Sequence, residues 1–429
     1  MSKTLVKILA VFLSLLMILP LAMSCGMLGG DENEESTTTT TKEDTNEATP
    51  PTDLDAAIAE NPYASAGLEL MHNVIDDYYT ARTDWLKSDK GNSGACAVWA
   101  VGSFIEALAE SYRLNPNDAE IKKIYIDALD GLLEAYKVEN VTIRTPNRGT
   151  FSGISYYNAT RGMSGDYYYD DNAWLCIQLL EAYTLLKDDK YLALAEENLE
   201  FLWTGWDEEV LGGGIYWDKS YGGKNTCANG PVAIAFLMAY QYTEKEEYLT
   251  KAKQIYDWAN EKLLEGNLYI DSLGKDGGKN SWKAAYNQAT MIYAASQLYE
   301  ITGEEDYYKH AKKVVTATIG LMFKVQGGRN DMDVSMNGNP IYKAWCIGWL
   351  VRSYVKYYQI DPAKNTAALK YMELVLDKEL TTKTKDGYYD PYFLSGDWGS
   401  ESKTDVLQPT GLVSVFCLAG YYDIYLKKK

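Results

Sequence analysis

The sequence predicts an all-α protein, a toroid of six inner and six outer helices called an (α/α)6 barrel. Two observations support this fold class. Apolar helices alternate with amphipathic ones along most of the chain, and long connections lead from the amphipathic helices into the next apolar ones. An open α-solenoid is the alternative, but its connecting loops would be short and uniform.

Four helix pairs give the clearest signal, each an apolar helix followed by an amphipathic one. They cover Asp171–Leu186 with Tyr191–Trp203, Pro231–Tyr242 with Glu246–Leu263, Ala284–Tyr299 with Glu305–Met322, and Ala344–Tyr358 with Thr366–Leu380. Weaker helical patterns bring the total to about twelve and cover Ala64–Thr80, Ala95–Ser111, Ala119–Tyr136 and Thr410–Leu426. A helix that is apolar nearly all round is expected to be buried, whereas an amphipathic helix covers it from outside.

The connections that precede the apolar helices are long and rich in Gly and aromatic residues. They cover Val141–Asp170, Gly205–Gly230, Leu268–Lys283, Gly327–Lys343 and Asp386–Pro409. Long loops in a compact domain usually carry function. Because all of these connections lead into inner helices, we expect them to gather at one end of the barrel and to form a cleft there.

The chain divides into a lipoprotein signal peptide (1–24), a disordered linker (25–54) and a folded (α/α)6 domain (55–429). Lys3 and Lys7 precede an apolar run that ends in Leu-Ala-Met-Ser-Cys25, which resembles a bacterial lipobox. We therefore expect cleavage before Cys25 and lipidation of its sulfur. The linker is rich in Thr and acidic residues and is too polar to bury itself. The expected location is the extracellular face of a bacterial membrane, lipid-anchored.

Charge and the scarcity of histidine exclude several classes of function. The formal net charge is −19 and no Lys/Arg cluster offers the basic face that nucleic acids require. The two histidines, His72 and His310, lie in separate helix-like stretches, so histidine-based triads and zinc sites are not expected. None of the six cysteines forms a CxxC pair. We expect no metal site and no cofactor.

The sharpest candidate for chemistry is the adjacent pair Asp170 and Asp171, at the start of an inner helix and flanked by aromatic residues. Acidic residues at a helix start can simply cap free N–H groups. Two other adjacent pairs, 76–77 and 188–189, lie in an early helix and in a turn at the opposite end. Glycosyl transfer requires two carboxyl groups in different protonation states, which a pair at the loop-rich end could supply. Spacing along the chain does not distinguish retaining from inverting geometry.

Three segments carry a resemblance to a known family: YYDDNAWL (168–175), GGGIYWDKSYGGKNTCANGP (212–231) and AAYNQAT (284–290). In this order they resemble glycoside hydrolase family 76, the endo-α-1,6-mannanases, and the likeness spans about residues 62–428. The resemblance implies an (α/α)6 catalytic domain and a retaining mechanism. Asp170 would be the nucleophile and Asp171 the general acid/base, acting on α-1,6-linked mannan or mannooligosaccharides.

Further residues near the same loops are candidates for binding the sugar. Tyr169, Trp217, Tyr286 and Trp398 could stack on mannose rings, and Asn225, Asn229, Asn287 and Gln288 could bind hydroxyl groups. Trp174 is a further aromatic candidate. The alternative role of the aromatic residues is packing, which is favoured for Trp174, and the alternative role of the amides is helix capping.

Three other functions compete with hydrolysis. A transglycosidase of the same family would pass the sugar to another sugar instead of water. A non-catalytic, glycan-binding surface lipoprotein would use the same cleft, although it would not need an intact carboxylate pair. Another (α/α)6 enzyme would show a basic, His-bearing cleft or DDxxD-like metal ligands, which this sequence lacks. We expect a monomer.

Overall fold

The computed structural model describes residues 50–80, 86–90, 96–162, 165–326, 333–336, 344–393 and 405–427. The predicted signal peptide, Cys25, most of the linker and Trp398 lie outside these ranges. The first described helix, α2 (Leu54–Glu60), begins at the last residue assigned to the linker. Among the described residues, no helix is both long and apolar enough to cross a membrane.

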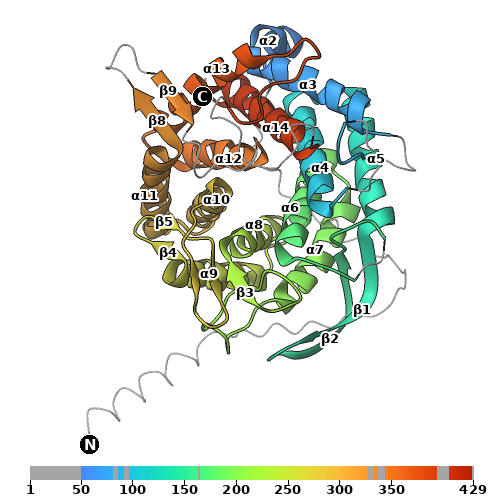
Figure 1. Ribbon diagram of the computed structural model, residues 1–429, viewed down its shortest axis with the longest axis vertical. Helices are drawn as coiled ribbons and strands as arrows, with labels where there is room; N and C mark the ends of the chain where they lie inside the picture. The colour runs from blue at the N-terminus through green and yellow to red at the C-terminus, as the bar shows by residue number, and fades with distance from the viewer. Residues whose placement is uncertain are drawn as a thin grey trace, which may run out of the picture. The chain divides into compact units, whose positions relative to one another are not determined.

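Six helices form a closed inner ring, which Figure 1 shows end-on. Each packs against the next, and the last returns to the first. In chain order they are α4 (Val98–Leu114), α6 (Tyr169–Leu186), α8 (Thr226–Thr243), α10 (Ala285–Thr302), α12 (Ala344–Ile360) and α14 (Leu407–Tyr421). A short π-helical segment, Tyr422–Leu426, extends α14. The closed ring confirms the barrel and excludes the open solenoid.

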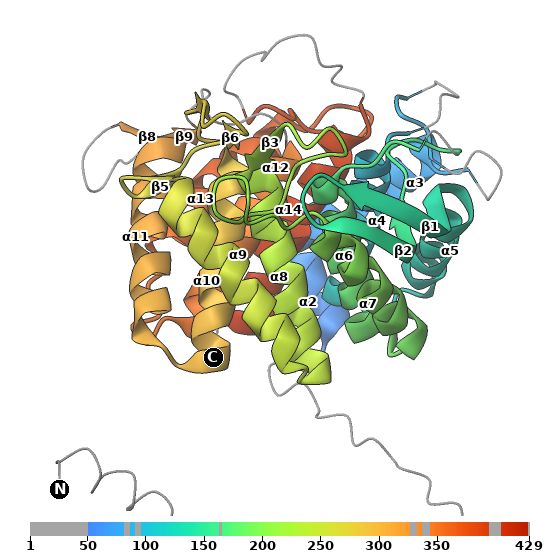
Figure 2. The same cartoon turned by 90° about the horizontal axis from the view of Figure 1, so that it is seen from below.

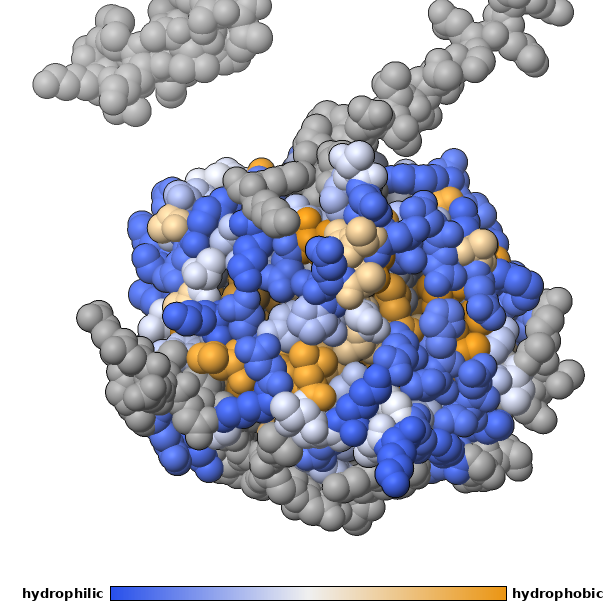
Figure 3. All heavy atoms as spheres, turned by 90° about the horizontal axis from the view of Figure 1, so that it is seen from above, coloured by the Kyte–Doolittle hydropathy of each residue, from blue (hydrophilic) through white to orange (hydrophobic). Residues whose placement is uncertain are grey.

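The outer helices cover this ring and expose their polar faces. They are α3 (Pro62–Tyr78), α5 (Ala119–Tyr136), α7 (Asp189–Thr204), α9 (Glu246–Lys262), α11 (Glu305–Met322) and α13 (Ala367–Glu379), which a 3-10 turn (Leu380–Thr382) follows. The surface on the side that lies uppermost in Figure 1 is mainly hydrophilic, with hydrophobic side chains gathered in short stretches between the polar ones (Figure 3). This pattern is what amphipathic outer helices produce.

Close approach between inner helices depends on small residues. A Cβ added at Gly230 in α8 would lie 2.3 Å from the hydroxyl of Thr290 in α10, and one at Gly411 in α14 would lie 2.1 Å from the backbone nitrogen of Trp345 in α12. The helix α8 begins at Thr226, five residues before the predicted start at Pro231. Proline is favoured in the first turn of a helix, which made position 231 look like the beginning.

In the described part of the chain, the strands lie in the connections from outer to inner helices and gather at one end of the barrel, at the top of Figure 2. The largest pair is an antiparallel hairpin of β1 (Lys137–Thr145) and β2 (Gly149–Tyr157), which we had expected to be loop. The smaller sheets pair β3 (Gly223–Asn225) with β6 (Ser272–Gly274) and β7 (Lys279–Asn280), β4 (Leu264–Glu265) with β5 (Leu268–Tyr269), and β8 (Phe323–Gln326) with β9 (Asp333–Met336).

The opposite end of the barrel has short turns. The C-cap residues of α6, α8 and α10 are Lys187, Glu244 and Gly303, each in the left-handed conformation with φ of 54°, 54° and 70°. The contrast between the two ends confirms the expectation that the long connections share one end.

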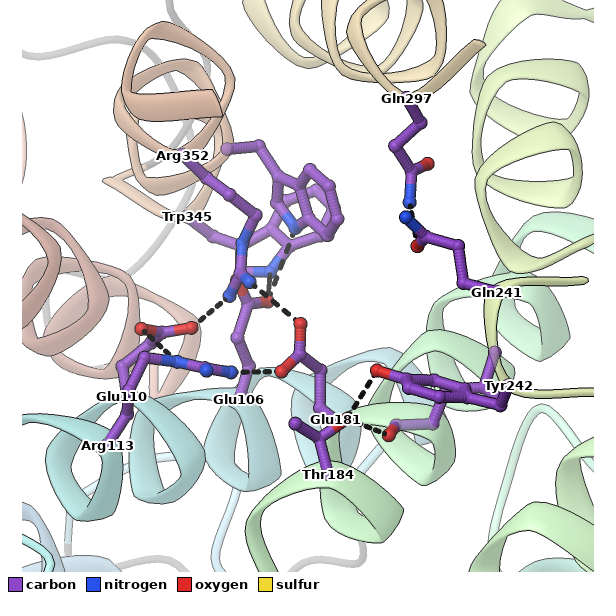
Figure 4. A network of polar contacts seen from close by, with 12 residues as sticks. Glu106, Glu110, Arg113, Glu181, Thr184, Gln241, Tyr242, Gln297, Trp345 and Arg352 are labelled. Carbon is purple, nitrogen blue, oxygen red and sulfur yellow. Dashed lines mark hydrogen bonds and ion pairs between the residues drawn. The ribbon is translucent and has the colours of Figure 1, made fainter. Parts of the chain in front are cut away.

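A charged network lies inside the ring (Figure 4). The guanidinium of Arg352 in α12 donates to Glu106 and Glu110 of α4, at 3.2 and 2.5 Å, and to Glu181 of α6 at 3.4 Å. Arg113 of α4 also pairs with Glu181. These side chains therefore connect three of the inner helices through the interior.

Candidate active site

Asp170 and Asp171 lie in the first turn of α6, at the loop-rich end of the barrel. The helix has Tyr168 at its N-cap, which provides no side-chain cap. Free N–H groups and the positive end of the helix dipole favour negative charge at this position. Both aspartates are half-buried.

Three donors surround the carboxylate of Asp170. The indole Nε1 of Trp217 donates to Oδ2 at 2.8 Å, and the thiol of Cys227 lies 3.3 Å from the same oxygen. The backbone N–H of Asp171 donates to Oδ1 at 2.9 Å. Within the described part of the chain, the side chain of Asp171 receives no comparable donor.

This asymmetry separates the protonation states of the two carboxyl groups. Burial raises the pKa of Asp170, and hydrogen bonds from Trp217, Cys227 and the Asp171 amide partly oppose that rise. Burial raises the pKa of Asp171 well above its ordinary value, and the negative charge of Asp170 raises it further. The pair therefore favours the state with one proton over the state in which both carboxyl groups are ionised, and in the favoured state the proton is on Asp171.

Trp217 is held beside Asp170 by the backbone around it. Its carbonyl accepts the N–H of Tyr169 at 2.7 Å, and its own N–H donates to the carbonyl of Gly223 at 3.0 Å. Its ring packs against Tyr168, with centroids 5.1 Å apart, and the residue remains 39% exposed. The structure thus combines an exposed aromatic face with a hydrogen bond to the carboxylate pair.

Tyr286 lies in the first turn of α10, where the charges of Cys227 and Asp170 act on it. Its ring is half-buried and approaches that of Trp345, with centroids 6.1 Å apart. The structure places Trp217 and Tyr286 around the same carboxylates, as the sequence had suggested. Trp174 is buried against Trp345 and Trp349, in agreement with the packing role favoured for it.

Tyr169 differs from its predicted role as a sugar platform. Its side chain is fully buried. The ring stacks on Phe201 with centroids 4.9 Å apart, and the hydroxyl pairs with that of Thr204 at 3.0 Å. Because neighbouring residues on a helix diverge by about 100°, Tyr169 faces the outer helix α7 while Asp170 points toward Trp217 and Cys227.

Two of the four amides are occupied by backbone groups. Asn229 accepts from the N–H of Ile215 at 2.8 Å and donates to the Ile215 carbonyl at 3.0 Å. Gln288 makes the same pair of bonds to Tyr269, at 2.7 and 2.8 Å. Both are fully buried, so they fix the connections beside the cleft and have no face left for a sugar hydroxyl. Asn229 also lies inside α8, whose N-cap is Asn225.

Asn225 and Asn287 keep free hydrogen-bonding capacity among the described residues. The half-buried side chain of Asn225 makes no cap hydrogen bond. The amide nitrogen of Asn287 lies 3.5 Å from Oδ1 of Asp271, while its Oδ1 is buried without a partner.

Asp271 is a residue near Cys227 and Tyr286 that the sequence reasoning missed. It precedes β6, and its Oδ2 accepts from Ser272 at 3.1 Å and from Asn280 at 2.9 Å. Burial raises its pKa, and its charge acts on Cys227 and Tyr286. The available signal was one of two separate aspartates, Asp271 and Asp276, in a long connection at the loop-rich end. The adjacent aspartates 170 and 171 stand out in the sequence, whereas only the fold brings Asp271 near Cys227 and Tyr286.

A family model described as glycosyl hydrolase family 76 matches residues 63–372, more than half of the chain. The chain belongs to this family. It is therefore a glycoside hydrolase, and the resemblance noted in its sequence is confirmed. A mannan endo-1,6-alpha-mannosidase of Candida glabrata is 25% identical over 199 residues, which cover 42% of this chain and 41% of the relative. The match thus spans about two fifths of that relative's length.

Solved structures share the fold. A family 76 glycoside hydrolase from a bovine Bacteroides thetaiotaomicron strain superposes with a TM-score of 0.72 at 21% identity, covering 85% of this chain and 79% of that one. An inactive variant of the Salegentibacter α-1,6-mannanase, with two consecutive aspartates replaced by asparagine, was solved with α-1,6-mannotriose. Its TM-score is 0.64 at 23% identity, and the match covers 83% of this chain and 99% of that one.

Proposed function

We propose that the protein hydrolyses α-1,6-mannosidic linkages in mannan with retention of configuration, using Asp170 and Asp171. The observation that carries this proposal is the asymmetry of the pair: three donors surround Asp170, while burial and the Asp170 charge keep a proton on Asp171. Retaining glycosidases need one carboxylate as nucleophile and one carboxylic acid as proton donor.

In the first step, an oxygen of Asp170 attacks the anomeric carbon while Asp171 gives its proton to the departing glycosidic oxygen. The C–O bond to the leaving sugar breaks, and a covalent mannosyl ester of Asp170 forms. In the second step, the Asp171 carboxylate takes a proton from water, which attacks the same carbon and releases Asp170. Both carboxyl groups return to their starting states.

The substrate assignment draws on two kinds of support. The relatives are named as mannan endo-1,6-alpha-mannosidases, and the Salegentibacter structure holds a short α-1,6-mannan fragment. In this chain, the exposed ring of Trp217 and the half-buried ring of Tyr286 offer apolar faces beside the carboxylates. Asn225 and Asp271 supply polar groups for hydroxyls at the same end, whereas the side chain of Asn287 is fully buried like those of Asn229 and Gln288.

We also propose that the enzyme acts as a monomer tethered by a lipid on Cys25 at the extracellular face of a bacterial membrane. The lipobox-like segment before Cys25 and the polar stretch behind it support this placement. Replacement of Cys25 by Ala should move the protein from the membrane fraction to the soluble fraction. Retention of the variant in the membrane fraction would contradict the anchor.

The test is incubation of the purified protein with unbranched α-1,6-mannan, alongside Asp170→Asn and Asp171→Asn. We expect oligosaccharide release by the wild type, with the α-anomer formed first in NMR spectra, and a loss of at least about 1,000-fold in each variant. Asp188→Asn is a matched control, because it changes a surface aspartate that caps α7 at the far end and asparagine caps equally well.

Each outcome has a distinct meaning. No release by the wild type would contradict the substrate, and binding without release would favour a glycan-binding lipoprotein. Longer products in place of reducing ends would identify a transglycosidase. Initial formation of the β-anomer, or full activity in both variants, would contradict the retaining mechanism on this pair.

A further inference from the structure

Cys227 lies in the first turn of α8, directly across from the carboxylate pair. Its sulfur is 3.3 Å from Oδ2 of Asp170, the oxygen that also accepts the indole N–H of Trp217. The side chain is buried, with 6% of the residue exposed.

The thiol is protonated at this position. Burial and the charges of Asp170, Asp271 and Asp171 raise the pKa of Cys227 well above its ordinary value. A thiol that keeps its proton is a weak hydrogen-bond donor, and the carboxylate of Asp170 is the acceptor. The contact is therefore an S–H to carboxylate hydrogen bond.

We propose that Cys227 is a positioning residue of the mannosidic cleavage, in which its thiol holds Oδ2 of Asp170. The inference rests on the proposed function, with Asp170 as nucleophile. Trp217 and Cys227 approach one oxygen from the loop before α8 and from α8 itself, while the Asp171 amide holds the other. A carboxylate held at both oxygens cannot rotate freely, so it keeps one orientation toward the anomeric carbon.

The thiol also biases the proton between the two aspartates. A donor to the ionised form of Asp170 favours that form, so its loss raises the Asp170 pKa. The titratable groups that face this contact are Asp171 from α6, Asp271 from the connection before α10, and Tyr286 from α10. None of these residues is substituted when Cys227 is replaced. A change in the acidic limb of activity therefore reports on the thiol.

The experiment compares Cys227→Val, whose apolar side chain is somewhat larger and has no donor, with Cys227→Ser, which restores one. Cys176→Val is the matched control, because Cys176 is a fully buried thiol on α6 whose sulfur faces the Ala195 carbonyl at 3.5 Å. Near-UV circular dichroism and thermal midpoints check that all three variants fold. The readouts are the pH profiles of kcat and KM on α-1,6-mannooligosaccharides.

In Cys227→Val we expect the acidic limb to move up by about half to one pH unit and kcat to fall by about three- to tenfold, with little change in KM. Cys227→Ser should return both toward wild type, and Cys176→Val should leave both unchanged. A folded Cys227→Val variant with the wild-type kcat and acidic limb would overturn the inference.

A substrate-free measurement separates this inference from the proposed function. NMR titration of ¹³C-labelled aspartate carboxyl groups, with Asp170→Asn and Asp171→Asn for assignment, follows the pair directly. A higher first pKa in Cys227→Val supports the role of the thiol, and an unchanged one refutes it. Failure of the wild type to cleave mannan would count against the substrate alone.

Discussion

At the scale of single residues, Asp170 and Asp171 differ through their surroundings, although they occupy one helix turn. Three donors oppose the effect of burial at Asp170, whereas the charge of its neighbour adds to it at Asp171. A raised pKa lets a buried carboxyl group act as a proton donor, but it lowers the free energy of unfolding. Its folded state holds a proton that the unfolded chain releases, so stability falls as pH rises between the two pKa values.

Asp171→Asn should therefore stabilise the protein, and increasingly so at higher pH. The contribution of Asp171 is fully present below its unfolded pKa, near 3.8, and is lost as pH rises through the folded value. Each unit of raised pKa corresponds to about 1.4 kcal/mol. Urea unfolding from pH 4 to pH 8 should show a widening difference between variant and wild type. A constant difference would contradict the raised pKa, and Asp188→Asn should show no such trend.

At the scale of elements, Lys224 holds the connection that carries Trp217. Its ammonium is fully buried and donates to the carbonyls of Asp207 and Val210, each at 2.6 Å, and of Gly213 at 2.5 Å. Burial lowers its pKa to about 8, and the nearby Asp207 opposes that change. One side chain of β3 thus fixes a connection whose tip lies beside the carboxylate pair.

Lys224→Met should destabilise the protein and weaken catalysis together. It leaves three carbonyls without their donor, a loss of about 2–4 kcal/mol in the free energy of unfolding. Because Trp217 would then lose its fixed place, kcat/KM should fall by about tenfold or more. Lys219→Met is the control, since that exposed lysine belongs to the same connection. Equal effects of the two changes, measured by urea unfolding and mannan cleavage, would contradict this role.

At the scale of the whole molecule, the network around Arg352 connects helices that are far apart in sequence. Glu106 and Glu110 come from α4, Glu181 from α6 and Arg352 from α12. The indoles of Trp345 and Trp349 donate to Oε2 of Glu106 at 2.9 and 3.3 Å. Trp345 in turn contacts Trp174, which follows the carboxylates in α6. Charges inside the ring thereby support the aromatic layer below the active site.

Arg352→Met should be strongly destabilising, by about 3–5 kcal/mol, because it leaves the buried carboxylate of Glu106 without its cation and leaves Arg113 alone to pair with Glu110 and Glu181. The loss should be smaller at acidic pH. Burial raises the pKa of Glu106, so this carboxyl group can take up a proton there and be neutral in the folded state. The double variant Glu106→Gln/Arg352→Met should recover part of the loss, since it removes one stranded charge. Chemical unfolding at pH 5 and pH 8 measures both effects. No recovery in the double variant would contradict the coupling of Glu106 to Arg352.

The sequence by itself determined the architecture and the catalytic candidates. Alternating apolar and amphipathic helices require two concentric layers, because each apolar helix must be buried and each amphipathic one has a single face to bury. The long connections had to share one end, since all of them lead into inner helices. Asp170 and Asp171 stood out because an adjacent acidic pair at that end is a local signal. The YYDDNAWL segment around them also carried the family resemblance.

Only the tertiary structure decided which neighbours serve the site. Cys227 contacts Asp170 from α8, and Asp271 acts on Cys227 from the connection before α10. Nothing beside either residue in the sequence predicts these interactions. Tyr169 and Gln288 belong to the same motifs as true cleft residues, yet they point into the core. On a helix, one step along the chain turns a side chain by about 100°. How the helix packs in the ring therefore fixes the direction of each side chain. That direction decides whether the residue can bind a sugar or packs in the core.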